Sequence, residues 1–132
     1  MSAQDTIRET VTSHPVVLYM KGSPDFPQCG FSAQAVQALR ANGVNTFHSV
    51  NIFEDPELRE ALTDGSADGM GSIRAIVAGA AAHLEKGGWL LFEHGYDQAR
   101  PVRALLEAAG FASIVSLPDL AGIPRVAGGK IG

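Results

Sequence analysis

The strand candidates are short runs of apolar residues rich in strand-forming types. Two of them, Val16–Met20 (VVLYM) and Trp89–Glu93 (WLLFE), are continuous, which is typical of strands buried in a parallel sheet. Further strands are expected over Thr46–Ile52, Ser113–Leu117 and Arg125–Lys130, and a turn rich in proline and glycine joins the last two.

Apolar residues at helical spacing lie between these strands. The predicted helices cover Asp5–Ser13, Phe31–Ala41, Pro56–Leu62, Ser72–Glu85 and Asp97–Ala109. We expect Asp55 to cap the third helix, Ser72 or Gly71 the fourth, and Asp97 the fifth. Helices that alternate with strands predict the α/β class, with a mainly parallel sheet and helices on both of its faces.

A change in composition divides the chain. Residues 63–71 (TDGSADGMG) are rich in glycine and aspartate, which indicates a linker or a long loop. We therefore expect one half-domain over residues 1–62 and a second over residues 72–132. With 132 residues, the chain is long enough for one compact domain with a real core.

Composition and charge exclude several classes of function. The net charge is -4 and the pI is about 5.4, which argues against nucleic-acid binding because such domains carry basic patches. No apolar run approaches the roughly 20 residues of a membrane helix, and the polar N-terminus resembles neither a signal nor a transit peptide. The single cysteine excludes an internal disulfide and fits a reducing cytosol, so we expect a cytoplasmic protein without a membrane partner.

Cys29 is the strongest candidate for chemistry. It lies between a loop that follows the first strand and the start of the helix over Phe31–Ala41. Free N–H groups and the dipole at a helix N-terminus favour the thiolate, and Lys21 adds a cation nearby. The order of strand, loop, cysteine and helix is that of thioredoxin-like redox sites. The alternative is a buried, inert thiol, and the position of Cys29 alone leaves both interpretations open.

The string around Cys29 resembles the monothiol glutaredoxins. YMKGSPDFPQCGFSAQAVQAL carries their Cys-Gly-Phe-Ser motif, NIFEDPELREAL is similar to the segment that follows in that family, and the resemblance covers residues 5–62. It implies a partial thioredoxin-like fold with Cys29 as the catalytic thiol and as the ligand of a shared 2Fe-2S cluster. Lys21 and Arg59 are then expected to hold the carboxylates of glutathione. Without the resemblance, Arg59 would more often be a solvated charge on the surface of a helix.

The same resemblance implies further contacts and partners. Gly30 and Phe31 are expected to offer backbone contacts to the ligand. Glutathione, a second copy of the chain when a cluster is bound, and iron–sulfur acceptor proteins are the implied partners. The implied role is iron–sulfur cluster transfer or redox regulation, as a thiol oxidoreductase or a cluster carrier. A single cysteine requires reduction to pass through a mixed disulfide with glutathione.

The second half resembles another family. After Leu62 the glutaredoxin pattern stops, and its Thr-x-Pro segment with a cis proline, its glycine pair and its later aspartate are missing. GGWLLFEHGYDQARPVRALLEAAGF and DLAGIPRVAGG resemble the C-terminal end of the release-factor glutamine methyltransferases, over about residues 61–132. This resemblance implies a Rossmann-type βαββ piece.

The methyltransferase chemistry is absent from the sequence. Neither that family's glycine-rich S-adenosylmethionine loop nor its Asn-Pro-Pro-Tyr motif occurs in the chain, so we expect no working methyltransferase. The alternative to a glutaredoxin-like protein is thus a methyltransferase fragment, or a chimera of two half-domains, without activity.

Two local features of the second half allow more than one interpretation. Glu93, His94 and Tyr96 lie at and after the end of a predicted strand and suggest catalysis, but we favour the interpretation that they are strand-end polar residues that pack a loop. Ile123-Pro124 mimics the missing cis-proline segment, but we expect Pro124 to be trans in a closing hairpin and distant from Cys29, since few X–Pro bonds are cis.

Overall fold

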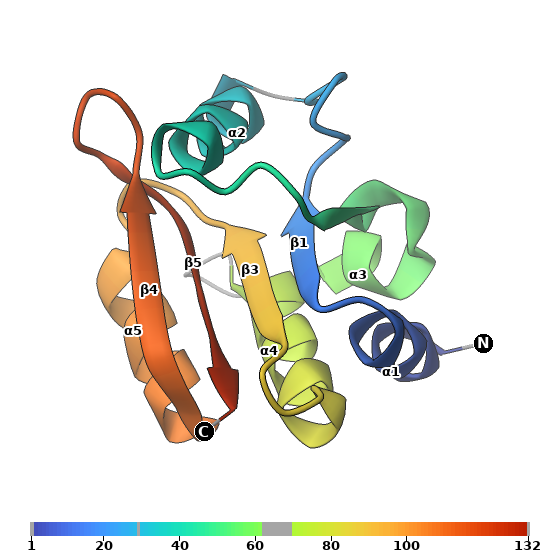
Figure 1. Ribbon diagram of the computed structural model, residues 1–132. Coiled ribbons are helices and arrows are strands. Elements are labelled where there is room, and N and C mark those ends of the chain that lie inside the picture. Colours follow the sequence, from blue (N-terminus) through green and yellow to red (C-terminus); the bar gives the residue numbers. More distant parts are fainter. Residues whose placement is uncertain (1, 29, 62–69, 132) are drawn as a thin grey trace.

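The computed structural model describes residues 2–28, 30–61 and 70–131, and of Phe31 only the backbone. Both halves contribute strands to one five-stranded sheet of order β2-β1-β3-β5-β4 (Figure 1). The elements are α1 (Ala3–Ser13), β1 (Val16–Met20), α2 (Gly30–Ala41), β2 (His48–Asn51), the 3-10 turn η1 (Ile52–Glu54), α3 (Pro56–Ala61), α4 (Gly71–His83), β3 (Trp89–Glu93), α5 (Ala99–Ala108), β4 (Phe111–Pro118) and β5 (Pro124–Ile131).

The sheet is parallel in one part and antiparallel in the other. Strand β1 pairs in parallel with β2 and with β3, whereas β5 pairs antiparallel with β3 and β4. The β1–β3 ladder, from Val16 opposite Trp89 to Tyr19 opposite Phe92, joins the two halves into one sheet. The predicted α/β class is therefore confirmed, and the antiparallel pairs come from the closing hairpin of β4 and β5.

Helices cover both faces of the sheet, as predicted, but unequally. The larger core packs α1, α3, α4 and α5 against side chains such as Val17, Tyr19, Leu90 and Phe92. The smaller core packs α2 alone against the opposite face. In the part of the chain that the structure describes, no helix has both the length and the apolar character needed to cross a membrane.

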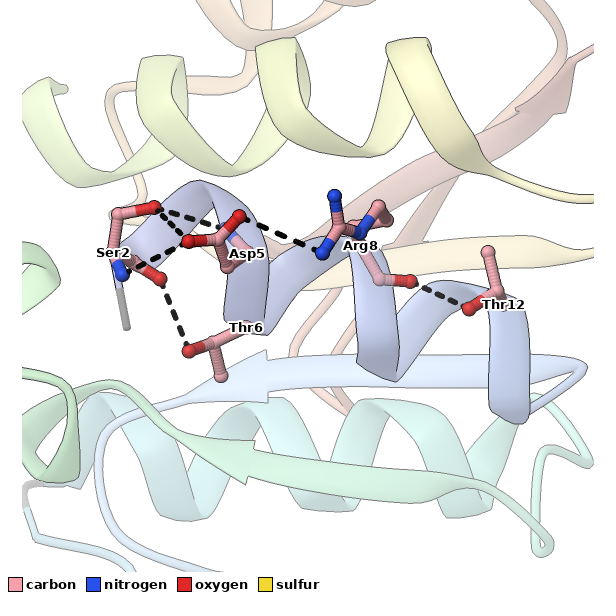
Figure 2. A network of polar contacts seen from close by, with 5 residues as sticks. All are labelled: Ser2, Asp5, Thr6, Arg8 and Thr12. Atoms are coloured by element: carbon pink, nitrogen blue, oxygen red, sulfur yellow. Dashed lines mark hydrogen bonds and ion pairs between the residues drawn. The ribbon is translucent and has the colours of Figure 1, made fainter.

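Helix α1 begins with a capping box (Figure 2). The Ser2 hydroxyl accepts a hydrogen bond from the Asp5 N–H at 3.2 Å, and the Asp5 carboxylate accepts from the Ser2 N–H at 3.3 Å. Two of the N–H groups that every helix start leaves free are thus satisfied by this pair. Arg8 lies 3.6 Å from the same carboxylate, which is an exposed ion pair of small energetic weight.

Helices α1 and α4 come from different halves and cross closely. Gly79 of α4 lies against α1, and a Cβ at this position would be 2.8 Å from the Gln4 Oε1 and 2.9 Å from the Ile7 Cγ2. The Gln4 amide also donates to the Ala75 carbonyl at 3.2 Å. A small residue at the crossing therefore allows the two halves to share the larger core.

Some of the predicted caps are wrong. Asp55 does cap α3, since its Oδ1 accepts from the Glu57 and Leu58 N–H groups at 3.0 and 3.2 Å. Helix α5, however, starts at Ala99 after Gln98, because a turn in which the Gln98 N–H donates to the Gly95 carbonyl includes Asp97. Helix α4 starts at Gly71 after Met70, with no side-chain cap from Gly71 or Ser72.

The closing hairpin agrees with the expectation for its proline. No peptide bond in the described residues is cis, so Pro124 is trans, and it starts β5 opposite Pro118. Its distance from Cys29 stays a prediction, because Cys29 lies outside the described residues. The predicted linker over residues 63–71 likewise lies outside them up to residue 69, and the domain boundaries stay a prediction.

The centre of the antiparallel part requires a glycine. A Cβ on Gly128 would overlap the carbonyl oxygen of Leu90 and lie 3.0 Å from the Leu91 Cα, and backbone atoms cannot move aside. We predict that Gly128→Ala lowers the free energy of unfolding by about 3 kcal/mol or more, measured by urea denaturation. Gly30→Ala is the matched control, because in the described structure a Cβ there has no atom within 4 Å beyond its chain neighbours and its own helix backbone. Equal stability of the two variants would contradict the close approach of β3 and β5.

Candidate functional site

The residues before Cys29 form a fixed loop between β1 and α2. The Gln28 N–H donates to the Lys21 carbonyl at 3.2 Å, and Gly22 forms a bridge with Pro27. Gly22 has φ +85, and its N–H donates to the Asn51 Oδ1 at 3.0 Å, which ties the loop to the end of β2. Cys29 itself lies outside the described residues, so its expected preference for the thiolate stays a prediction.

The other predicted site residues are only partly brought together. Lys21 follows the end of β1 and lines a cavity, whereas Gly30 is the exposed first residue of α2. Arg59 is exposed in the last turn of α3 and does not line the cavity beside Lys21. The side chain of Phe31 is not described. The joint role of Lys21 and Arg59 in binding glutathione therefore stays a prediction.

Glu93, at the end of β3, contacts both sides of the Cys29 loop. Its Oε1 accepts a hydrogen bond from the Lys21 N–H at 3.0 Å, and it also hydrogen-bonds to the side chain of the buried Ser32. Burial raises the pKa of Glu93, an effect that the contacts with Ser32 and Lys21 partly offset. A carboxylate of the second half thus holds the segment that carries the motif of the first half.

His94 is the next residue and is 5% exposed. Its N–H donates to the Arg125 carbonyl, and its Nδ1 lies 2.8 Å from the Gly95 carbonyl oxygen. Since a carbonyl only accepts, the proton is on Nδ1. Burial lowers the pKa of His94, and the charge of Arg125 acts in the same direction. Its Nε2 is therefore a buried lone-pair acceptor, and it has no hydrogen-bond partner among the described residues.

The cavity beside these residues has a volume of about 220 Å³ and lies at the carboxyl ends of β1 and β3. Helix α2 connects β1 to β2 across one face of the sheet, whereas α3 and α4 lead to β3 across the other. This reversal of direction opens a crevice between neighbouring parallel strands, which is where open α/β sheets bind ligands. Lys21, Glu93 and His94 lie at that position.

Our interpretation of Glu93, His94 and Tyr96 as loop-packing residues holds only in part. His94 does bind the loop through Gly95, but Glu93 contacts the other half of the chain, and Tyr96 is 65% exposed. In the sequence, the available signal for these contacts was the presence of polar residues at the ends of two apolar strands. Their significance depends on β1 and β3 being neighbours, which the sequence alone does not reveal.

Comparisons with known proteins confirm the two resemblances. The glutaredoxin family model matches residues 16–72. Monothiol glutaredoxin-5 of Saccharomyces cerevisiae mitochondria is 47% identical over 62 residues, which are 46% of this chain and 41% of that protein. Release factor glutamine methyltransferase of Burkholderia pseudomallei is 57% identical over 75 residues, which are 57% of this chain and 26% of that protein.

The chain thus spans less than half the length of either relative. A crystal structure of a release-factor-specific protein-(glutamine-N5) methyltransferase from Alicyclobacillus acidocaldarius aligns with 97% of this chain and 88% of that one. The identity is 20% and the TM-score is 0.49, too low to infer a common fold. The class supported is therefore a glutaredoxin-like first half joined to a segment similar to release factor glutamine methyltransferases.

The raised pKa of Glu93 has a consequence for stability. The folded state disfavours the charged form of Glu93, so ionisation of this side chain lowers the free energy of unfolding. The loss begins as the pH rises through the pKa of glutamate in the unfolded chain, about 4.3, and is complete above the higher pKa of the folded state. We predict that Glu93→Gln is more stable than the parent chain at neutral pH and that the difference shrinks to zero in acid. Urea denaturation as a function of pH tests this, with the exposed Glu85→Gln as control. A difference that grows in acid would show that the charged form is the stabilised one.

Proposed function

We propose that the chain is a glutaredoxin-like thiol protein that reacts with glutathione through Cys29. The observation that carries this proposal is the match of residues 16–72 to the glutaredoxin family, with the sole cysteine inside the Cys-Gly-Phe-Ser motif. The fixed loop from Lys21 to Gln28 and the start of α2 at Gly30 support it, because they flank that cysteine.

The proposed reaction has two exchange steps. The Cys29 thiolate attacks the glutathione sulfur of a mixed disulfide on a substrate, so a Cys29–glutathione bond forms and the substrate thiolate leaves and takes up a proton. A second glutathione thiolate then attacks this bond, which releases oxidised glutathione and returns the Cys29 thiolate. A single cysteine suffices for both steps.

Lys21 is the residue proposed to bind a glutathione carboxylate. Its charge, however, already interacts with Glu93, whose carboxylate accepts from the Lys21 N–H. The carboxylate of the second half therefore competes with the ligand for the same cation, and repels a carboxylate placed beside it. We expect glutathione binding to be weaker than Lys21 alone would provide.

The described residues do not form a closed site for a 2Fe-2S cluster. They contain no group of three or more His, Cys, Asp or Glu side chains placed to hold a metal ion. A 2Fe-2S cluster takes four thiolates, and the whole chain has one cysteine. Cluster binding would thus need two chains and two glutathione molecules, and we propose it only in that form.

The alternative is an inactive methyltransferase fragment, which the 57% identity to the Burkholderia enzyme favours. The match covers only 26% of that enzyme, and the sequence lacks the cofactor motifs. Saturable binding of S-adenosylmethionine in a calorimetric titration would favour a methyltransferase-related function over the glutaredoxin-like proposal.

Glutathione-dependent reduction of a mixed disulfide tests the proposed reaction. We predict that Cys29→Ser abolishes it and that Lys21→Met raises the KM for glutathione about tenfold, because one ion pair is lost. Glu93→Gln should lower that KM several-fold, since the competing charge is removed. Arg59→Met should change it less than Lys21→Met, because Arg59 lies outside the cavity. Full activity of Cys29→Ser would refute the proposal.

Reconstitution with iron, sulfide and glutathione tests the cluster separately. We predict visible absorption only with glutathione present, in a dimeric fraction on gel filtration, and none with Cys29→Ser. A cluster in a glutathione-free monomer would contradict the ligand count, and the absence of any cluster would restrict the protein to thiol exchange.

A further inference from the structure

A groove along the outer side of α2 is lined by both halves of the chain. Its floor consists of α2 residues at helical spacing, namely Ala33, Val36, Gln37, Arg40 and Ala41. Pro24 and Pro27 line it from the loop before Cys29, and Leu120 lines it from the β4–β5 hairpin. The groove has a volume of about 550 Å³ and is open to solvent, because most of the floor residues are exposed.

Leu120 lies at the tip of a hairpin that is fixed by hydrogen bonds. The Oδ1 of Asp119 accepts from the Ala121 and Ile123 N–H groups at 2.9 and 3.1 Å. Its Oδ2 accepts from the Arg125 Nε at 3.0 Å, and both side chains of this ion pair are buried. Leu120 is nevertheless 75% exposed. An apolar side chain that is held rigidly in water loses little conformational freedom when a partner covers it, which favours binding.

Both walls of the groove are tied to neighbouring segments. At the base of the hairpin, the Asn42 side chain donates to the Pro118 carbonyl at 3.2 Å, so the hairpin lies beside the end of α2 (Figure 1). In the proline-containing loop, the backbones of Ser23 and Phe26 exchange hydrogen bonds at 3.2 and 3.1 Å, which closes a turn. The groove is therefore formed before a partner binds.

Arg40 carries the one charge among the described residues that line the groove. It is exposed in the last turn of α2 and forms no ion pair with another residue that the structure describes. The rest of the lining is apolar or neutral. A complementary partner therefore has apolar side chains along the groove and a carboxylate at the Arg40 end.

We propose that this groove binds an extended segment of the protein substrate whose mixed disulfide with glutathione reacts at Cys29. The inference rests on the proposed thiol exchange and adds the recognition of its substrate. Pro27 precedes Cys29 by two residues, so in the sequence the groove starts next to the thiol. From Ala33 to Arg40 the helix rises about 10 Å, the length of about three extended residues. The expected substrate has apolar residues next to its cysteine and an acidic residue about four positions away.

Other occupants fit the groove less well. A second copy of the chain, packed on this face about a two-fold axis, would bring two Arg40 cations into one small interface. A nucleic acid would meet a chain of net charge -4. A compact ligand would stay largely in water, because the groove does not enclose it.

Two glutathionylated peptides, EALACALAE and KALACALAK, test the charge. Each carries its mixed disulfide on the central cysteine, and its sequence is the same in both directions, so the orientation of the bound segment does not matter. We expect kcat/KM for removal of glutathione to be about threefold higher for the glutamate peptide, as an exposed ion pair provides. Arg40→Gln should abolish this preference, whereas Arg8→Gln, on α1, should keep it. A parent chain without the preference would overturn the role of Arg40.

Leu120→Ser tests the apolar contact. We expect it to lower kcat/KM for both peptides about fivefold, because less apolar area is buried. The mixed disulfide of free cysteine and glutathione is too short to reach the hairpin, so its rate should not change. Tyr96→Ser is the matched control, since Tyr96 is also exposed and does not line the groove. Equal losses for the peptides and the small disulfide, or no loss for the peptides, would contradict docking at the hairpin.

Binding without chemistry separates this inference from the proposed function. The labelled peptide EALASALAE, titrated with Cys29→Ser in a fluorescence anisotropy experiment, should bind saturably and more weakly when Leu120→Ser is added. That result supports the groove even if the parent chain reduces no mixed disulfide, an outcome that refutes the thiol exchange alone. Reduction of the small disulfide without peptide binding would refute the groove and leave the thiol exchange standing.

Discussion

The parallel ladder between β1 and β3 is the interaction on which the rest of this structure depends. It pairs Val16 to Tyr19 of the glutaredoxin-like half with Trp89 to Phe92 of the other half. Both strands are strongly apolar and have buried side chains on both faces, so neither is stable at the edge of a sheet. Because each strand covers the other, the two halves of the chain share one sheet and its larger core.

The same ladder creates the candidate site. With β1 and β3 as neighbours, their carboxyl ends place Lys21 beside Glu93 and leave a cavity where the chain reverses its direction of crossover. Glu93 then contacts Lys21 and Ser32, which lie on the two sides of Cys29 in the sequence. The geometry of the thiol segment is therefore held by a residue that the glutaredoxin resemblance does not include.

The elements of the fold were predictable from local patterns, and their arrangement was not. The run VVLYM gave β1 with its observed ends, and the helical spacing placed α2 within one residue. Caps were less reliable, as at Asp97, because a turn closed by Gln98 and Gly95 outcompeted the expected side-chain cap. The hydrogen bond between Lys21 and Glu93 could not be predicted from local patterns, since it joins residues 72 positions apart.

The two faces of the sheet show how the joining of the halves limits stability. Close crossing of α1 and α4 at Gly79 lets helices of both halves share the larger core. On the opposite face, α2 packs over only part of the sheet, and a groove of about 510 Å³ lies beside it, lined by residues such as Val16, Leu91, Val115 and Leu117. Apolar area that stays in water contributes nothing to folding, so the free energy that holds the halves together comes mainly from the face that carries four helices. A substitution at the α1–α4 crossing should therefore disturb the larger core of both halves, and with it the wall of the cavity that α4 supplies through Ile73 and Ile76.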